Sequence, residues 1–281
     1  MGSEMCIRDR LVSTLSKVLE LDFNRIQFTP DLMPADILGT NMVVENPEGG
    51  REFQFQKGPI FTQICLADEI NRATPKTQSA MLETMQEGTV TASGTRYVLQ
   101  KPFFVLATQN PIEQEGTYPL PEAQLDRFLF KLNVGYSNRE ELSTILERTT
   151  KGEFHDPEKI MGGEEILELQ QLIRKVILAD HIRDYIVRSV LATHAEGPHA
   201  VDVTNQYIRW GSSPRGAQTI VLAAKVRALL EGRFNVSFED VRRVYLPALR
   251  HRVVPNFEAQ AEGVTSDQVL LEILDAVPEK E

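Results

Sequence analysis

Apolar residues recur at helical spacing at the beginning of the chain and again through its C-terminal half. Leu11, Leu15, Val18 and Leu19 fall on one side of a helix predicted over residues 11–21. The same period predicts further helices over residues 139–148, 164–176, 181–194, 215–231, 238–250 and 267–276. The C-terminal part of the chain is therefore expected to be helical.

Capping residues mark the ends of several predicted helices. Thr74 followed by Pro75 predicts the start of a helix, because Thr is a good N-cap and Pro suits the first helical position. Gly88 predicts the end of the same helix. Capping-box spacing marks two later starts, at Ser237 with Asp240 and at Thr265 with Gln268.

Short apolar runs bounded by polar turns predict β-strands in the first half of the chain. They lie at residues 25–28, 63–67, 103–107 and 128–132. The last three have the continuous apolar character of parallel strands, which are buried on both faces. Two β-rich arms around Ser93 predict a hairpin over residues 89–99. Strands that alternate with helices favour an α/β core.

The patterns predict a division of the chain into four segments. The first ten residues have no periodicity and are interpreted as a non-native leader. The helix at Leu11 has no N-cap, which predicts that a segment is missing ahead of it. Glycine and proline in residues 150–163 predict a linker. The expected segments are a leader (1–10), an α/β core (11–136), a connecting helix and linker (137–163) and a helical domain (164–281).

Composition excludes several classes of protein. Thirty Lys and Arg against forty Asp and Glu give a net charge of −10, which argues against direct nucleic-acid binding through a broad basic face. Cys6 and Cys65 form no Cys-x-x-Cys pair, so neither a structural zinc site nor a disulfide scaffold is expected. No apolar run reaches the length of a membrane span, and no signal peptide is visible. The default compartment is the cytoplasm.

The strongest chemical signal is an apolar strand that ends in two carboxylates, Asp68 and Glu69. The carboxyl ends of parallel strands form the ligand crevice of a sheet. There an Asp can hold Mg²⁺ and a following Glu can polarise an attacking water. The alternative is a strand that happens to end in an acidic turn.

Asn110 follows the next predicted strand and could orient a water or sense a γ-phosphate. The alternative is a turn, since Asn-Pro is a common turn pair.

Two arginines stand in contexts that suit phosphate. A short helix starting near Pro121 delivers Arg127 just before a predicted strand, and the alternative for Arg127 is a surface ion pair with Asp126 or Glu122. Ser213 is a good N-cap, so Arg215 lies in the first turn of a helix. A cation there opposes the helix dipole and requires an anionic partner.

Three strings in this order and spacing resemble the MoxR family of AAA+ ATPases. They are ADEINRA at residues 67–73, LATQNP at 106–111 and GTYPLPEAQLDRF at 116–128. The resemblance extends over nearly everything from Leu11 onward. It implies a parallel-sheet P-loop-type AAA+ core, incomplete at the N-terminus, followed by an all-α helical lid domain.

The resemblance also assigns roles to individual residues. Asp68 and Glu69 match the Walker B pair, Asn110 matches sensor 1, Arg127 matches the arginine finger and Arg215 matches sensor 2. Asp68 is then expected to bind Mg²⁺, and Asp68, Asn110 and Arg215 to bind ATP. Catalytic roles are implied for Glu69, Asn110, Arg127 and Arg215.

The family implies an assembly and two inserted regions. It implies a homo-oligomeric ring, expected to be a hexamer, that remodels or matures client proteins with a partner carrying a von Willebrand factor A domain. Residues 31–58 resemble the helix-2 insert, whose strand-like part at 52–56 faces the pore. Residues 89–99 resemble the hairpin ahead of sensor 1.

The sequence departs from the family at one essential place. It contains no Walker A string Gly-x-x-x-x-Gly-Lys-Thr, which supplies backbone amides, a lysine and a hydroxyl to the phosphates and Mg²⁺. We interpret the chain as a truncated member, expected to be inactive alone. Two alternatives stay open: a magnesium chelatase ATPase subunit-like protein, or a non-catalytic ring or scaffold protein.

Overall fold

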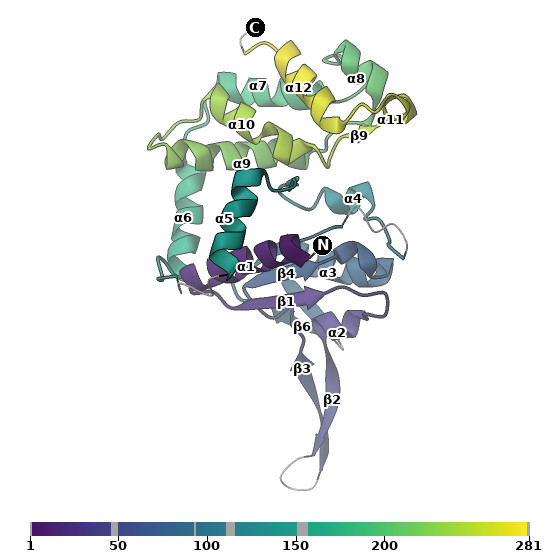
Figure 1. The fold of residues 1–281 in the computed structure, drawn as a ribbon, viewed down its shortest axis with the longest axis vertical. Helices are drawn as coiled ribbons and strands as arrows, with labels where there is room; N and C mark the ends of the chain where they lie inside the picture. The colour runs from purple at the N-terminus through teal and green to yellow at the C-terminus, as the bar shows by residue number, and fades with distance from the viewer. Residues whose placement is uncertain (1, 46–49, 93, 111–115, 151–156, 280–281) are drawn as a thin grey trace. The chain divides into compact units, whose positions relative to one another are not determined.

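The computed structural model describes the chain except residues 1, 46–49, 93, 111–115, 151–156 and 280–281. The described chain forms two compact units (Figure 1). The first unit contains residues 1–120 and 136–168, and the second contains residues 121–135 and 169–281. Among the described residues, none of the helices combines the length and apolar character needed to cross a bilayer.

A parallel sheet of three strands forms the centre of the first unit. Its order is β1 (Phe23–Gln27), β4 (Ile64–Asp68) and β7 (Phe104–Ala107). Val12 of α1 (Gly2–Val18) is buried against Ile64 and Leu66 on one face of this sheet. The predicted parallel α/β core is confirmed by these strands.

Helix α1 differs from its prediction at both ends. It begins at Gly2 instead of Leu11 and stops at Val18 instead of Leu21. Glu20, with φ of 47°, turns the chain out of the helix toward β1. The helix thus includes most of residues 1–10, while the non-native origin of those residues stays a prediction.

The helix predicted from its caps is α3 (Pro75–Glu87). Thr74 is its N-cap, and Gly88 ends it in the left-handed region with φ of 62°. The predicted hairpin follows as β5 (Thr89–Ala92) and β6 (Thr95–Val98), which pair antiparallel. Ser93, expected in its turn, lies outside the described residues.

The region predicted to be an insert contains a second hairpin. A short helix α2 (Pro34–Leu38) leads into β2 (Gly39–Glu45), which pairs antiparallel with β3 (Arg51–Lys57). The prediction of a strand over residues 52–56 is confirmed by β3. The ring of Phe55 stacks on that of Tyr97 of β6, with centroids 4.3 Å apart, so aromatic packing joins the two hairpins.

Two further helices follow residue 135, where the chain returns from the second unit to the first. Helix α5 (Arg139–Thr150) belongs to the first unit, and α6 (Gly163–Lys175) begins there and continues into the second. Both agree with the predicted helices. Much of the predicted linker, residues 151–156, lies outside the described part of the chain.

The second unit is built from the predicted C-terminal helices. They are α7 (Asp180–Leu191), α9 (Pro214–Leu230), α10 (Phe238–Leu249) and α12 (Ser266–Ala276). Tyr185, Ile220 and Tyr245 are fully buried in the core between them. The shorter elements are α4 (Glu122–Leu125), α8 (Asp202–Tyr207), β8 (Ile208–Trp210), β9 (Val254–Pro255) and α11 (Phe257–Glu262).

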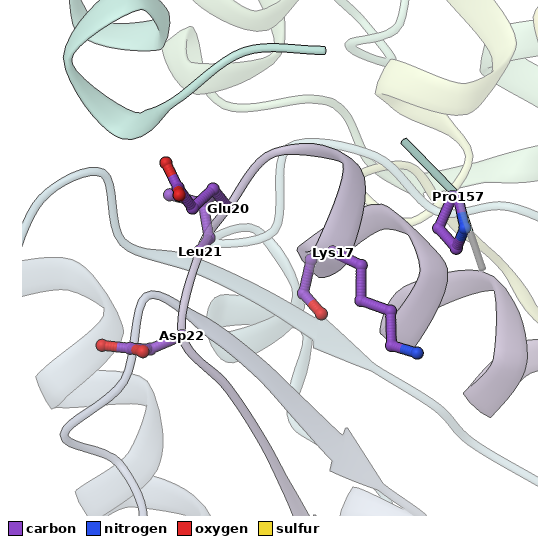
Figure 2. Close-up of a pocket in the computed structure, with 6 residues that line it drawn as sticks. Lys17, Glu20, Leu21, Asp22 and Pro157 are labelled. Carbon is purple, nitrogen blue, oxygen red and sulfur yellow. The ribbon is translucent and has the colours of Figure 1, made fainter. Parts of the chain in front are cut away.

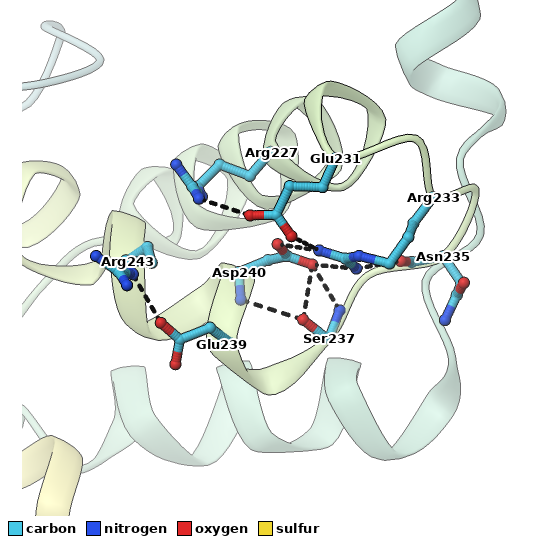
Figure 3. A network of polar contacts seen from close by, with 8 residues as sticks. All are labelled: Arg227, Glu231, Arg233, Asn235, Ser237, Glu239, Asp240 and Arg243. Atoms are coloured by element: carbon cyan, nitrogen blue, oxygen red, sulfur yellow. Dashed lines mark hydrogen bonds and ion pairs between the residues drawn. The ribbon is translucent and has the colours of Figure 1, made fainter.

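A buried carboxylate fixes the turn between α9 and α10 (Figure 3). Asp240, 1% exposed, accepts hydrogen bonds from the backbone N–H and the hydroxyl of Ser237. Arg233 bridges Asp240 and Glu231, at 2.7 Å from each. The predicted capping box at Ser237 is confirmed, and so is the one at Thr265.

The strand predicted over residues 128–132 was wrong, because this segment has no regular secondary structure. Its carbonyls are occupied by side chains from the end of α10. The carbonyl oxygen of Phe128 lies 2.9 Å from Nε2 of His251 and accepts from Arg252 at 2.7 Å. Leu129 also accepts from Arg252, at 3.1 Å. These bonds replace a strand ladder and attach the segment to the second unit.

The division into units cuts across the predicted segments. Residues 121–135, expected within the core, pack with the C-terminal helices, while residues 136–162 pack with the sheet. The boundaries of the predicted domains therefore stay predictions.

Candidate functional site

The register of the sheet brings several polar side chains to one edge. Gln27 pairs with Asp68 in parallel register, and Thr108 follows the last residue of β7. All three therefore lie at the carboxyl ends of their strands. Because side chains alternate across a sheet, Arg25 and Gln27 share the face that also carries Leu66 and Asp68. This edge is where a parallel sheet binds its ligands.

Asp68 is almost fully enclosed by polar partners. Its side chain is 3% exposed, and Arg25 Nη2 lies 2.5 Å from Oδ2. The hydroxyl of Thr108 donates to Oδ1 at 2.5 Å. A buried carboxylate costs several kcal/mol unless a cation or donors compensate it, so this position is built to hold positive charge.

Glu69 is held in an unusual backbone conformation. Its φ of 55° and ψ of 47° lie in the left-handed region, which residues other than Gly rarely adopt. Its N–H donates to the hydroxyl of Thr108 at 2.9 Å, which helps to hold this geometry. Gln27 and Arg72 donate to its Oε2 at 2.8 and 3.1 Å. Strain of this kind gathers at functional sites, where the surrounding structure maintains it.

A hydrogen-bond chain orients the amide of Gln27. Arg25 donates to its Oε1 at 2.9 Å, which leaves the Nε2 group to face Glu69. Arg25 thus contacts Asp68 directly and Glu69 through Gln27. The two carboxylates have different partners, as expected if they do different work.

Asn110 lies half-buried two residues beyond Thr108, after the same strand. It is at the predicted edge of the sheet. Pro111, the next residue of the predicted turn, lies outside the described residues. The structure therefore agrees with the position expected for Asn110 but assigns it no role.

A shallow pocket of about 520 Å³ lies elsewhere in the first unit (Figure 2). Ser16, Lys17, Glu20, Asp22 and Pro157 contribute to its lining. Asp22 precedes β1, so the pocket is at the amino ends of the strands. A strand of five residues is about 16 Å long, which separates this pocket from the carboxylates. It plays no part in the candidate site.

Arg127 and Arg215 both belong to the second unit. Arg127 is exposed in the turn after α4, and Arg215 is in the first turn of α9. Ser213 caps α9 as predicted, accepting from the N–H of Arg215 at 3.2 Å. The anionic partner that Arg215 requires is Asp126, 3.2 Å away. The ion pair considered for Arg127 is not found among the described residues, where Asp126 is paired with Arg215 and Arg252.

These partners also lower the pKa of Asp126 below its ordinary value. Partial burial would raise its pKa, but hydrogen bonds from Ser213 and Arg252 and the charge of Arg252 outweigh burial and lower it. The pKa of the neighbouring His251 is also lowered, but in a histidine this favours the neutral form. Burial lowers the pKa of His251 to about 4, so its ring is neutral at pH 7.

Sequence reasoning found the carboxylates and missed the groups around them. Arg25, Gln27 and Thr108 were not predicted, although each stands at or near the end of a predicted strand. The carboxyl-end rule, applied to every strand, would have selected Gln27 and Thr108. Arg252 had no local signal.

The donors at the sheet edge fit Mg²⁺. Mg²⁺ prefers oxygen ligands and is commonly held by one or two carboxylates together with phosphate oxygens. Asp68 and Thr108 supply such oxygens, and the guanidinium of Arg25 already places positive charge there. Within the described residues no group of three or more His, Cys, Asp or Glu could hold a metal alone. Cys65 is no ligand, since burial raises the pKa of its thiol to about 12.

Comparison with known proteins identifies the family of the chain. The profile of the ATPase family associated with various cellular activities (AAA) matches residues 6–130, and that of the AAA lid domain matches residues 202–273. Chaperone MoxR1 of Mycobacterium tuberculosis is 41% identical over 95% of this chain and 70% of its own length. The chain belongs to the MoxR family of AAA+ ATPases.

Other relatives support the same family. YeaC of Bacillus subtilis, which has no assigned function, is 42% identical over 95% of this chain and 80% of its own length. The crystal structure of a candidate ATPase from Cytophaga hutchinsonii superposes with a TM-score of 0.88 at 42% identity, covering 95% of this chain and 80% of that one. The MoxR chain therefore has the AAA+ fold, with a parallel-sheet core and a helical lid region.

Proposed function

We propose that this MoxR-family chain belongs to an ATPase that couples ATP hydrolysis to the remodelling or maturation of client proteins. The observation that carries the proposal is the pair Asp68 and Glu69, buried at the carboxyl end of β4 with separate sets of partners. Family membership supports the ATPase chemistry, and the relative named as a chaperone supports the client.

The two carboxylates divide the work. Asp68, with the hydroxyl of Thr108 beside it, would hold Mg²⁺. When bound, Mg²⁺ neutralises negative charge on the phosphate oxygens. Glu69 would accept a proton from the attacking water, and Gln27 holds its Oε2 in place.

The remaining predicted residues act on phosphate. Asn110 would orient the attacking water or contact the γ-phosphate. Arg215 would contact the γ-phosphate of its own protomer, and Arg127, which is exposed, would reach that of a neighbour. Guanidinium groups suit this task because they stay charged and pair with phosphate through two donors.

The proposed assembly is a homo-oligomeric ring, a hexamer in this proposal, located in the cytoplasm. A partner with a von Willebrand factor A domain would deliver or select the client. The hairpin of β2 and β3, which carries Phe53 at 77% exposure, is suited to contact apolar segments of that client.

The 281-residue chain is expected to hydrolyse ATP negligibly. Its 281 residues contain no Gly-x-x-x-x-Gly-Lys-Thr string. Without the amides and lysine of that loop, the phosphates lose most of their positioning, on which phosphoryl transfer depends. A purified sample turning over ATP at about 1 s⁻¹ would contradict this expectation.

The test of the function uses the chain with a Walker A segment joined ahead of Leu11. This extended protein should hydrolyse ATP, and Arg127→Ala should lower kcat by roughly 10³-fold. Mixed with a Glu69→Gln protein, the Arg127→Ala protein should regain activity, because the Glu69→Gln protomer lends its intact arginine. Arg215→Ala mixed with the same partner should regain none.

The outcomes separate the function from the assignment of the arginines. An extended, folded and assembled protein that hydrolyses no ATP would refute the ATPase and favour the scaffold alternative. Rescue in both mixtures, or in neither despite proven co-assembly, would refute the assignment of one arginine in trans and one in cis.

A further inference from the structure

Arg215 is paired with Asp126, which directly precedes Arg127, the other arginine proposed to act on phosphate. Its Nη1 lies 3.2 Å from Oδ2 of Asp126, and Arg127 is the next residue. The carboxylate that pairs with Arg215 thus belongs to the residue directly before Arg127. All these residues belong to the second unit.

Asp126 is anchored by a third arginine that is almost completely buried. The Arg252 side chain is 2% exposed, and its Nε donates to Oδ1 of Asp126 at 2.9 Å. The same guanidinium donates to the backbone carbonyls of Asp126, Phe128, Leu129 and Ala248. A side chain with this many partners fixes the turn that carries Arg127.

The bond from Asp126 to Arg215 is much weaker than the bond to Arg252. The Arg215 side chain is 45% exposed, and its side chain makes a single described hydrogen bond, to Asp126. Solvent screens such a pair, which leaves it little net stability. Arg215 can therefore leave Asp126 while Arg252 keeps the carboxylate in place.

The start of α9 is shaped around this acid. Ser213 caps the helix and also donates its hydroxyl to Oδ1 of Asp126 at 2.7 Å. A Cβ on Gly216 would lie 2.1 Å from Ser212 Oγ and 2.7 Å from Leu249 Cδ2, so the close approach of α9 to the end of α10 requires glycine. Ser213, Arg215 and Gly216, which make these contacts, lie within four successive positions of the chain.

We propose that Asp126 is a positioning residue that acts as a releasable latch for Arg215. In the resting state it holds the Arg215 guanidinium beside the Arg127 turn. A nucleotide phosphate, a stronger anion, replaces Asp126 as the partner of Arg215, while Arg252 retains Asp126. This inference rests on the proposed function, because it assumes that Arg215 meets phosphate.

The latch explains how an arginine is kept at the N-terminus of a helix before its ligand arrives. The dipole of α9 repels a cation in its first turn, and Asp126 compensates that repulsion. Exchange for phosphate leaves the compensation intact, since the phosphate also carries negative charge. It also changes the partners of the acid next to Arg127, which connects the two arginines.

The experiment follows the side chains of the 281-residue chain by NMR with ¹³C,¹⁵N-labelled arginine and aspartate. Inorganic tripolyphosphate serves as the probe, so no hydrolysis is needed. The Nε signal of Arg215 should shift during the titration, and the carboxyl carbon of Asp126 should shift with the same half-saturation. The Nε signal of Arg252 should stay where it is.

Asp126→Asn removes the competing charge, so Arg215 should bind tripolyphosphate about three- to fivefold more tightly. Asp126→Glu keeps the charge and should stay near the wild-type value. Asp267→Asn breaks a separate arginine pair of the same unit, with Arg250, and is the matched control. If Asp126→Asn does not fold, the wild-type titration still decides.

Three results would overturn the latch. They are an Arg215 signal that does not respond, an Asp126 carboxyl carbon that stays fixed while Arg215 responds, and equal half-saturation in the wild type and Asp126→Asn. Because the probe is not hydrolysed, failure here leaves the ATPase proposal untouched. Failure of hydrolysis in the extended protein likewise leaves this titration valid.

Discussion

In the Arg25–Asp68 ion pair of the first unit the carboxylate is the buried member, and in the Arg252–Asp126 pair of the second unit the arginine is the buried member. The side chain of Asp68 is 3% exposed and that of its partner Arg25 is 38% exposed. The side chain of Arg252 is 2% exposed and that of its partner Asp126 is 17% exposed. The buried member of each pair is fixed by its surroundings. The groups that can be exchanged are the more exposed arginines bound to Asp68 and Asp126, namely Arg25 at 38% exposure and Arg215 at 45%.

The two arrangements match the charges of the ligands proposed for them, a cation at the sheet edge and an anion in the second unit. At the sheet edge a fixed anion, Asp68, can exchange the guanidinium of Arg25 for another cation. In the second unit the fixed cation Arg252 holds Asp126, which can give up Arg215 to another anion. Removing one member of a buried pair costs much more than breaking an exposed pair. We call Arg25, Gln27, Asp68 and Glu69 the first cluster, and Asp126, Arg215 and Arg252 the second cluster. The comparison can therefore be tested by substituting members of each cluster.

The largest expected effect separates the two carboxylates of the first cluster. In the extended protein, Glu69→Gln should lower kcat by about 10²- to 10⁴-fold while ATP affinity persists, because the amide cannot accept the proton of water. Asp68→Asn should instead weaken binding that depends on Mg²⁺. Hydrolysis rates and fluorescent-nucleotide titrations with and without Mg²⁺ measure both. Equal losses of nucleotide affinity in the two variants would contradict this division.

The next effect tests the anchor of the second cluster. Arg252→Gln should lower the free energy of unfolding by about 3–5 kcal/mol, since it leaves Asp126 and several carbonyls without their buried donor. Urea unfolding of the 281-residue chain measures this change. Arg243→Gln is the control, because its pair with Glu239 has side chains 66% and 63% exposed. A loss of stability no larger than that of Arg243→Gln would show that the buried Arg252 pair contributes no more than an exposed pair.

A smaller effect concerns pH. His251 has a pKa near 4 in the folded chain against an ordinary value of 6.5, because burial disfavours its charged form. Between these two pH values the unfolded chain binds more protons than the folded chain. The free energy of unfolding should therefore fall as the pH drops from 6.5 to 4, and the full contribution of His251 to stability should be present above pH 6.5.

The substitution His251→Gln keeps a donor for the Phe128 carbonyl and removes the titration. It should make stability less dependent on pH in this window, by about 2 kcal/mol between its ends. Unfolding midpoints at several pH values measure the difference. Identical pH profiles for the variant and the wild type would mean that His251 is not the group responsible.

The smallest effect is expected at the exposed arginine of the first cluster. Arg25→Gln should lower the free energy of unfolding by about 1–2 kcal/mol, because buried Asp68 loses its cation but keeps the hydrogen bond from the Thr108 hydroxyl, and the partly exposed position of the guanidinium admits water. The measurement is the urea unfolding used for Arg252→Gln. A loss as large as that of Arg252→Gln would remove the contrast between the two clusters.

Local signals allowed much of the fold to be predicted. Thr74, Ser213 and Ser237 mark helix starts through bonds to residues a few positions away, and the structure has helices at all three. The strand that ends at Asp68 was predicted because a buried parallel strand has a distinctive apolar run. Such signals depend on neighbouring residues and can be read directly from the chain.

Distant partners could not be predicted. The segment from Phe128 has strand-like composition, yet its carbonyls bond to His251 and Arg252, which are more than 120 residues away. The dipole argument showed that Arg215 needs an anion, but it could not select Asp126. At the site, the carboxylates were found from their position, while Arg25 and Gln27 became visible only through the register of β1 with β4.

The attachment of Phe128 and Leu129 to Arg252 has a consequence for recombination between relatives. A crossover in the linker before Gly163 would join the Asp126 of one parent to the Arg252 of another. The two residues would then have to fit without having evolved together. Exchange of the second unit as a working module requires residues 121–135 to be transferred with residues 169–281. The two separate stretches of the gene that encode these residues must therefore be inherited together.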